Sequence, residues 1–181
     1  MRTSQSHPLR IDEVAMPDGG VIGLTFCPGK HQDDAMTGAW ARDLDLDLDA
    51  VVDWGAVVVV TLVTATELAD LKVKNLGPAV QARGLQWLHL PIEDVQTPTT
   101  EWMAAWSGAS PALHEILDRG GKVLVHCKGG LGRAGTVAGL LLVEAEIEAA
   151  EAIAQVRHAR QGAIETRGQE DFVEKHRRRS G

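Results

Sequence analysis

One cysteine and one arginine of this chain are spaced as the two working groups of a phosphate-ester site would be. Cys127 and Arg133 lie six positions apart, and three of the five residues between them are glycines. A loop this rich in glycine can curl so that successive backbone N–H groups point inward and bind an anion. The helix that we expect to begin near Arg133 would direct its positive N-terminal end at the same point.

The residue types of this loop fit a cysteine nucleophile that attacks a phosphate ester. A thiol beside an anion-binding loop should ionise easily, and the thiolate is the nucleophilic form. The planar guanidinium of Arg133 can hold two phosphate oxygens at once. We therefore predict that Cys127 and Arg133 are catalytic. The residues expected to bind the phosphate are Lys128, Gly129, Gly130, Leu131, Gly132 and Arg133.

Two plainer interpretations of the loop remain beside this one. Cys127 could be a small core residue, and the turn could bind the phosphate of a nucleotide without cysteine chemistry. The common nucleotide-binding turns have the patterns G-x-x-x-x-G-K-[ST] or G-x-G-x-x-G. This loop has Lys128 before its glycines, and it lacks the third glycine of the second pattern. The cysteine phosphatase interpretation is therefore favoured.

The run from His126 to Arg133 resembles the signature of the cysteine-based protein tyrosine phosphatase superfamily, and of its small dual-specificity branch in particular. The likeness also includes residues 23–30, 90–94 and 162–166, as well as Gln169. It implies hydrolysis of phosphotyrosine, phosphoserine or phosphothreonine in a phosphorylated protein or peptide. It further implies a phosphocysteine intermediate and a reaction that needs no metal or other cofactor.

Proton transfer requires a further group, and Asp94 is the candidate. When a thiolate displaces an alkoxide or phenoxide from phosphorus, the leaving oxygen needs a proton. Asp94 follows a predicted strand, as Cys127 does, and it matches the position of the acid in the resembled family. Its neighbour Glu93 should point the opposite way along an extended loop. The alternative for Asp94 is a surface carboxylate that caps the next helix.

The resemblance also implies two supporting residues. Gln169 resembles the glutamine that positions the attacking water in some relatives, although a solvated helix residue is an equal alternative. We expect His126 to orient the loop through hydrogen bonds rather than to act as a base. The seven histidines show no H-x-x-x-H spacing, so we predict no metal site.

Two positions complicate this interpretation. Most relatives have serine or threonine directly after the arginine, where the hydroxyl helps the sulfur leave the phosphoenzyme, but this chain has Ala134. Thr136 lies further along the expected helix and cannot be assumed to replace it, so we expect slow breakdown of the phosphoenzyme. Cys27 could form a protective disulfide with Cys127, but a buried structural thiol is the favoured interpretation.

The loop must be positioned by the elements around it, and the hydrophobic pattern predicts strands and helices in alternation. Residues 42–54 fit both patterns, and the strand that follows them favours a helix. Thr97 is the expected cap of a long helix, with Pro98 in its first turn. Strands are expected at 21–26, 56–62, 85–90 and 122–126, with 8–14 and 21–26 as a short hairpin around 18–20. A short helix is expected to begin at 66–67, and further helices near 77–84, 97–118, 133–145, 149–161 and 166–178. This order predicts an α/β fold with a central, mainly parallel sheet flanked by helices on both faces.

Composition narrows the class of protein further. The 181 residues suit one phosphatase domain, 1–181, in which 1–20 form a hairpin or a partly ordered segment and 173–181 a basic tail. We see neither a membrane-spanning stretch nor a signal peptide, and the thiol chemistry needs a reducing compartment, so we expect the cytoplasm. The net charge of −7 argues against nucleic-acid binding. The sequence does not indicate the oligomeric state.

Other functional classes remain as alternatives to a protein phosphatase. A pseudophosphatase that captures a phosphorylated partner gains some support from Ala134, but the presence of Cys127, Arg133 and Asp94 argues against it. A sulfur-transfer or arsenate-reducing enzyme does not explain Asp94. A phosphoinositide phosphatase would favour a second lysine in the loop, where this chain has Leu131.

Overall fold

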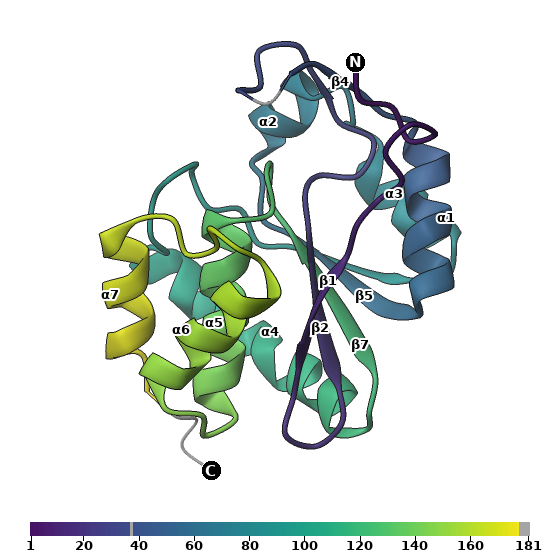
Figure 1. Ribbon diagram of the computed structural model, residues 1–181. Coiled ribbons are helices and arrows are strands. Elements are labelled where there is room, and N and C mark those ends of the chain that lie inside the picture. The colour runs from purple at the N-terminus through teal and green to yellow at the C-terminus, as the bar shows by residue number, and fades with distance from the viewer. Residues whose placement is uncertain (37, 178–181) are drawn as a thin grey trace.

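A five-stranded sheet in the order β1-β2-β7-β5-β6 forms the centre of the molecule (Figure 1). The computed structural model describes residues 1–36 and 38–177. The strands are β1 (Asp12–Ala15), β2 (Val21–Thr25), β5 (Ala56–Thr61), β6 (Gln86–His89) and β7 (Lys122–His126). β1 pairs antiparallel with β2, and the other neighbours are parallel. The predicted mainly parallel sheet is therefore confirmed.

The inner strands are buried on both faces, which explains their unbroken apolar sequences. Residues 58–60 of β5 and 123–125 of β7 are fully buried valines and leucines. Parallel sheets with helices on both faces select such runs, because neither face of the strand meets water. A separate two-stranded sheet pairs β3 (His31–Gln32) with β4 (Trp40–Ala41), and the sequence analysis did not anticipate it.

Helices cover both faces of the sheet (Figure 1). On one side lie α1 (Leu44–Trp54) and α3 (Leu76–Ala82), and on the other α4 (Thr100–Asp118), α5 (Gly132–Glu144), α6 (Ala149–Ala159) and α7 (Arg167–Lys175). The short helix α2 (Ala65–Asp70) follows β5. Every residue of α5 is buried, because the helix packs against the sheet, α6 and α7. A helix that is apolar on all sides belongs at such a position.

Helix α1 resolves the ambiguous segment in favour of the predicted helix. The Asp43 side chain caps it by accepting the Leu46 N–H at 3.0 Å. Gly55 ends it with a φ of 99°, a left-handed conformation that favours glycine. Leu48 and Val51 are fully buried, whereas Leu46, which belongs to the alternating pattern, is exposed. The segment therefore forms the helix that its apolar stripe predicts, and not the strand that its alternating pattern would favour.

The start of α4 differs from the prediction by two residues. The capping side chain is Thr99, whose Oγ1 accepts the Trp102 N–H at 3.1 Å, and not Thr97. Pro98 lies directly before the cap rather than in the first turn of the helix. The loop between β6 and α4 is accordingly longer than expected, and this loop carries Asp94.

Candidate active site

The loop after β7 closes tightly around the sulfur of Cys127. The backbone N–H of Gly130 donates to Cys127 Sγ at 3.2 Å, and the cysteine is 3 % exposed. Gly130 has a φ of +77°, and a Cβ there would lie 2.5 Å from the backbone of Thr25 in β2. Only glycine allows this approach between the loop and the neighbouring strand. The predicted phosphate-binding residues from Lys128 to Leu131 thus form a turn between β7 and α5, and Gly132 is the first residue of α5.

Arg133 is held by a partner that the sequence analysis missed. Glu67 accepts its Nη1–H and Nη2–H groups at 2.7 and 2.9 Å, a bidentate and partly buried pair. A second bond from Nη1 reaches the carbonyl of Ile92 at 2.8 Å. Burial alone would raise the pKa of Glu67, but the bonds from Arg133 and Thr64 lower it below its ordinary value. Glu67 is therefore an ionised anchor for the guanidinium.

One sequence signal does point to Glu67. Thr64-x-x-Glu67 forms a capping box at the start of α2, directly after β5. The pattern predicts the helix start but not the partner of the carboxylate. That partner depends on the strand order, which places the end of β5 beside the end of β7.

Asp94 lies at the mouth of the site. Its Oδ1 is 3.2 Å from Nη2 of Arg133 and accepts the Val95 N–H at 3.0 Å. The side chain is 57 % exposed, unlike the buried Cys127 and Arg133. A group that must meet the leaving oxygen of a substrate needs such access. The structure thus brings Asp94 and Arg133 together, and Cys127 opens the loop that ends at Arg133.

A buried lysine behind the loop is a second residue that the sequence analysis missed. Lys30 Nζ donates to the carbonyl of Lys128 at 3.1 Å and lies 4.5 Å from the ring centre of Trp40. Burial lowers the pKa of Lys30 to about 8, although attraction to the thiols of Cys27 and Cys127 opposes this effect. Lys30 follows β2, which pairs in parallel with β7, so that Lys30 lies close to the loop after β7. A prediction of this strand pairing could have indicated Lys30.

Cys27 lies beside the same loop. Its backbone N–H donates to the carbonyl of Lys128 at 3.2 Å, and its thiol is fully buried. Burial strongly raises the pKa of this thiol. Both Cys27 and Cys127 are free thiols in the structure.

His126 is buried in the sheet rather than exposed in the loop. Its Nδ1 lies 3.2 Å from the carbonyl oxygen of Cys127, and its Nε2 lies 2.7 Å from Thr61 Oγ1. Burial lowers the pKa of His126 to about 4. The imidazole is therefore neutral near pH 7 and is bound at both nitrogens.

The chain between α6 and α7 covers the start of α5. Gln169 is fully buried, and its Oε1 accepts the Thr166 N–H at 3.2 Å in a capping box. Its Nε2 lies beside Gly132, where an added Cβ would be 2.9 Å away. The carboxylate of Glu165 accepts the Gly132 N–H at 2.9 Å, a contact that the sequence analysis did not predict. One N–H of the loop is therefore already bound to a negative charge.

The hydroxyl of Thr136 does not replace the one that is missing at Ala134. Ala134 is fully buried, and Thr136 Oγ1 donates to the carbonyl of Gly132 at 2.7 Å. This bond to the backbone one turn earlier occupies the single proton of the hydroxyl. Thr136 therefore does not donate to the sulfur of Cys127 in this structure.

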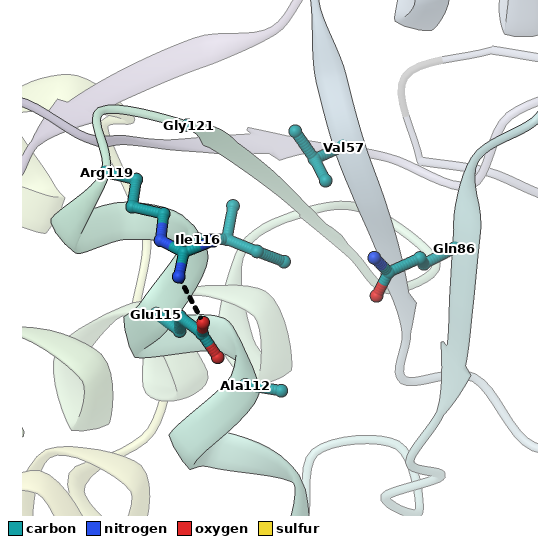
Figure 2. Close-up of a pocket in the computed structure, with 7 residues that line it drawn as sticks. All are labelled: Val57, Gln86, Ala112, Glu115, Ile116, Arg119 and Gly121. Carbon is teal, nitrogen blue, oxygen red and sulfur yellow. Dashed lines mark ion pairs between the residues drawn. The ribbon is translucent and has the colours of Figure 1, made fainter.

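A surface pocket at the other end of the sheet is unrelated to this site. Figure 2 shows its lining residues around the ion pair between Arg119 and Glu115, which spans 2.7 Å. Val57, Gln86 and Gly121 lie at the starts of three parallel strands, β5, β6 and β7. The cysteine loop lies at the carboxyl ends of these strands, where ligands bind in sheets of this kind. In residues 1–36 and 38–177, no three His, Cys, Asp or Glu side chains are grouped to hold a metal ion.

Comparison with known proteins gives consistent matches. The family model described as Swiss Army Knife protein, DSP-PTPase phosphatase domain, matches residues 39–173. Cyclin-dependent kinase inhibitor 3 of Mus musculus is 32% identical over 158 residues, which cover 86% of this chain and 71% of that protein. Tyrosine-protein phosphatase CDC14 of Candida albicans is 35% identical over 83 residues, which cover 45% of this chain and 15% of that protein.

Solved structures give the same result. The crystal structure of kinase associated phosphatase, with its catalytic-site cysteine substituted by serine, has a TM-score of 0.80 to this chain at 28% identity. That match covers 92% of both chains. Tk-PTP in its active form has a TM-score of 0.63 at 30% identity and covers 90% of this chain and 95% of its own.

Proposed function

The chain belongs to the dual-specificity branch of the cysteine-based protein tyrosine phosphatases and is a protein phosphatase, and we propose that Cys127 is its nucleophile. The observation that carries this proposal is the arrangement around Arg133. Glu67 fixes its guanidinium, Asp94 lies 3.2 Å from it, and Cys127 opens the same loop. These are the three chemical groups that displacement at phosphorus requires.

In the first step, the Cys127 thiolate attacks the phosphorus atom and the bond to the leaving oxygen breaks. Asp94 gives its proton to that oxygen. Arg133 and the N–H groups of the loop bind the other three oxygens, whose negative charge they stabilise in the transition state. The two hydrogen bonds that Arg133 donates to Glu67 support this role, because they hold the guanidinium in place before the substrate binds.

In the second step, water hydrolyses the phosphocysteine. Asp94, now a carboxylate, takes a proton from the attacking water, and inorganic phosphate leaves while the thiolate is restored. We assign Gln169 to the positioning of this water. Its buried amide lies beside Gly132. Its Oε1 accepts the capping bond, and its Nε2 donates one hydrogen to the carbonyl of Gln96 at 3.4 Å, which leaves the second hydrogen of Nε2 for the water.

We propose that the substrate is a phosphorylated protein or peptide, with phosphate on tyrosine, on serine or threonine, or on both. Membranes and nucleic acids are not proposed as partners, and the oligomeric state is not assigned. None of the described helices is long and apolar enough to cross a bilayer. The net charge of −7 does not suit nucleic acid. We propose that residues 1–181 form one phosphatase domain and that it acts in the cytoplasm, because a reducing compartment keeps both cysteines as thiols.

Hydrolysis of a generic aryl phosphate in the presence of EDTA tests this proposal. We expect turnover by the wild type, none by Cys127→Ser, and a kcat lowered about a hundredfold or more in Asp94→Ala, which lacks the acid. Activity that survives in Cys127→Ser would overturn the mechanism. Binding of phosphopeptides without turnover by the wild type would instead indicate a pseudophosphatase.

A further inference from the structure

A row of hydrogen bonds runs from the edge of the sheet to the nucleophile. Trp87 Nε1 donates to Thr61 Oγ1 at 2.8 Å, and Thr61 Oγ1 lies 2.7 Å from Nε2 of His126. Nδ1 of His126 lies 3.2 Å from the carbonyl oxygen of Cys127. The groups lie on one face of the sheet, because Thr61 pairs with His126, and Trp87 pairs with Val59, two residues before Thr61.

The chemistry of these groups fixes the position of each proton. The indole of Trp87 is only a donor, so Thr61 Oγ1 accepts its proton. The carbonyl of Cys127 is only an acceptor, so Nδ1 of His126 must carry a hydrogen. Burial keeps the pKa of His126 at about 4, so the ring is neutral and its Nε2 has no hydrogen. Nε2 therefore accepts the single hydroxyl proton of Thr61, and all bonds run in one direction.

The last of these bonds determines the orientation of a peptide plane in the loop. A trans peptide unit is planar, and its C=O and N–H groups point in opposite directions. When His126 holds the carbonyl of Cys127, the N–H of Lys128 must point away from His126. This N–H is the first of the loop amides that we assign to phosphate binding. Its direction is therefore set by residues in the sheet.

We propose that Trp87 and Thr61 are positioning residues for Cys127: their hydrogen bonds hold His126 in the tautomer with hydrogen on Nδ1 and thereby fix the peptide after the nucleophile. This inference rests on the proposed role of Cys127. Gly77 of α3 belongs to the same arrangement, because a Cβ there would lie 2.5 Å from the Trp87 ring. The packing of α3 against the Trp87 ring is thus connected, through these hydrogen bonds, to the catalytic loop.

The test combines the tautomer of His126 with kinetics. Imidazole ¹⁵N resonances distinguish a nitrogen that carries hydrogen from one that does not. In the wild type we expect hydrogen on Nδ1 of His126 and none on Nε2. Trp87→Phe removes one of these bonds and Thr61→Val removes two, so we expect mixed tautomers in both variants and a kcat/KM lowered about fivefold for each bond lost, the value of one net hydrogen bond.

Two further variants separate positioning from packing. Thr61→Ser keeps the hydroxyl and should restore the wild-type tautomer and rate. Trp54→Phe removes an indole bond to Glu13, at 2.9 Å on another part of the sheet, and should change neither readout. The proposal is overturned if Thr61→Val and Trp87→Phe fold and keep the Nδ1–H tautomer. It is also overturned if Thr61→Ser loses as much activity as Thr61→Val.

The tautomer is measured without substrate, so this result does not depend on catalysis. Activity surviving in Cys127→Ser would remove the proposed function while leaving the tautomer readout intact. A wild-type His126 with hydrogen on Nε2 would remove the positioning proposal while leaving the role of Cys127 intact. The two failures are therefore distinguishable.

Discussion

At the scale of single residues, the Glu67 carboxylate decides which part of Arg133 is left for a substrate. Its two oxygens occupy Nη1 and one side of Nη2, and Ile92 takes the other proton of Nη1. The N–H groups left for a phosphate are therefore Nε–H and the Nη2–H on the side that faces Asp94, 3.2 Å away. We expect the bound phosphate to take the place of the Asp94 carboxylate, which then faces the leaving oxygen.

The absence of a hydroxyl after Arg133 has a kinetic consequence. Ala134 cannot donate to the sulfur of Cys127, and the hydroxyl of Thr136 is bound to Gly132. A hydroxyl there would stabilise the departing thiolate, so we expect Ala134→Ser to raise steady-state turnover and to shrink the pre-steady-state burst in parallel. Rapid-quench measurement of both quantities checks this. An unchanged burst amplitude and rate would contradict it.

The residues of the site could be predicted from the sequence where their spacing is local, or where the family resemblance supplied the position, as for Asp94. Cys127 and Arg133 are six positions apart, so one glycine-rich turn is enough to suggest both. Glu67 and Lys30 are far from the loop in sequence and reach it only because β5 and β2 lie on either side of β7. The sequence does not specify the strand order, so it does not show that these two residues lie near the loop.

At the scale of elements, the segment between α6 and α7 places a negative charge on the phosphate loop. Glu165 accepts the Gly132 N–H at 2.9 Å, a group that we propose also binds the phosphate. We expect Glu165→Gln to lower the inhibition constant of inorganic phosphate about fivefold, because a repulsion of roughly 1 kcal/mol between like charges is removed. Competition with an aryl phosphate substrate measures this constant.

A matched control for that variant lies at the far end of the sheet. Glu115→Gln removes a carboxylate from the pocket in Figure 2 and should leave phosphate inhibition unchanged. Equal inhibition constants for Glu165→Gln and the wild type would show that this carboxylate does not compete with the ligand.

The elements themselves followed from the sequence to different degrees. Residues 122–126 form β7 as predicted, because an apolar run bounded by glycines on both sides has few alternatives. The cap of α4 was wrong by two residues, since three threonines around Pro98 offered similar signals. The strands β3 and β4 were missed, because two residues are too few to show an alternating pattern.

At the scale of the whole molecule, a buried carboxylate joins three parts of the helical layer. Glu144 of α5 accepts bonds from His114 and Trp106 of α4 at 3.0 and 2.9 Å, and from His176 after α7 at 2.6 Å. Burial alone would raise the pKa of Glu144, but these three bonds lower it to about 2. The carboxylate thus contributes to the stability of the folded state while it is ionised.

The sign of this contribution predicts a pH dependence. The pKa of Glu144 is lower in the folded state than its ordinary value of 4.5, so the stabilisation is present above pH 4.5 and is lost as the pH falls toward 2. We expect Glu144→Gln to lower the free energy of unfolding at pH 7 by about 2–4 kcal/mol. Urea unfolding between pH 3 and 7 should show this difference shrinking at low pH.

The control for this series is Glu174→Gln, which changes an exposed carboxylate on α7. It should leave the unfolding free energy nearly unchanged at every pH. A Glu144→Gln difference that stays constant from pH 7 to pH 3 would contradict the assignment of the stabilisation to the ionised carboxylate.

The overall architecture was predictable because helices separate most of the strands. Parallel strands with helical connections place their carboxyl ends along one edge, and Cys127, Asp94 and α2 all follow such ends. The strand order β1-β2-β7-β5-β6 was not predicted, because the hydrophobic pattern of the strands is compatible with several strand orders. The order nevertheless assembles the site, since it sets β7 between β2 and β5.

The most direct test of the central claim is detection of the phosphocysteine itself. Wild-type enzyme is mixed with an aryl phosphate, quenched in acid within the burst phase, and examined by intact and peptide mass spectrometry. We predict a single phosphoryl adduct on Cys127, which persists because breakdown is slow, and no adduct in Cys127→Ser. Rapid turnover with no adduct on Cys127 at any quench time, or an adduct on another residue, would contradict the account.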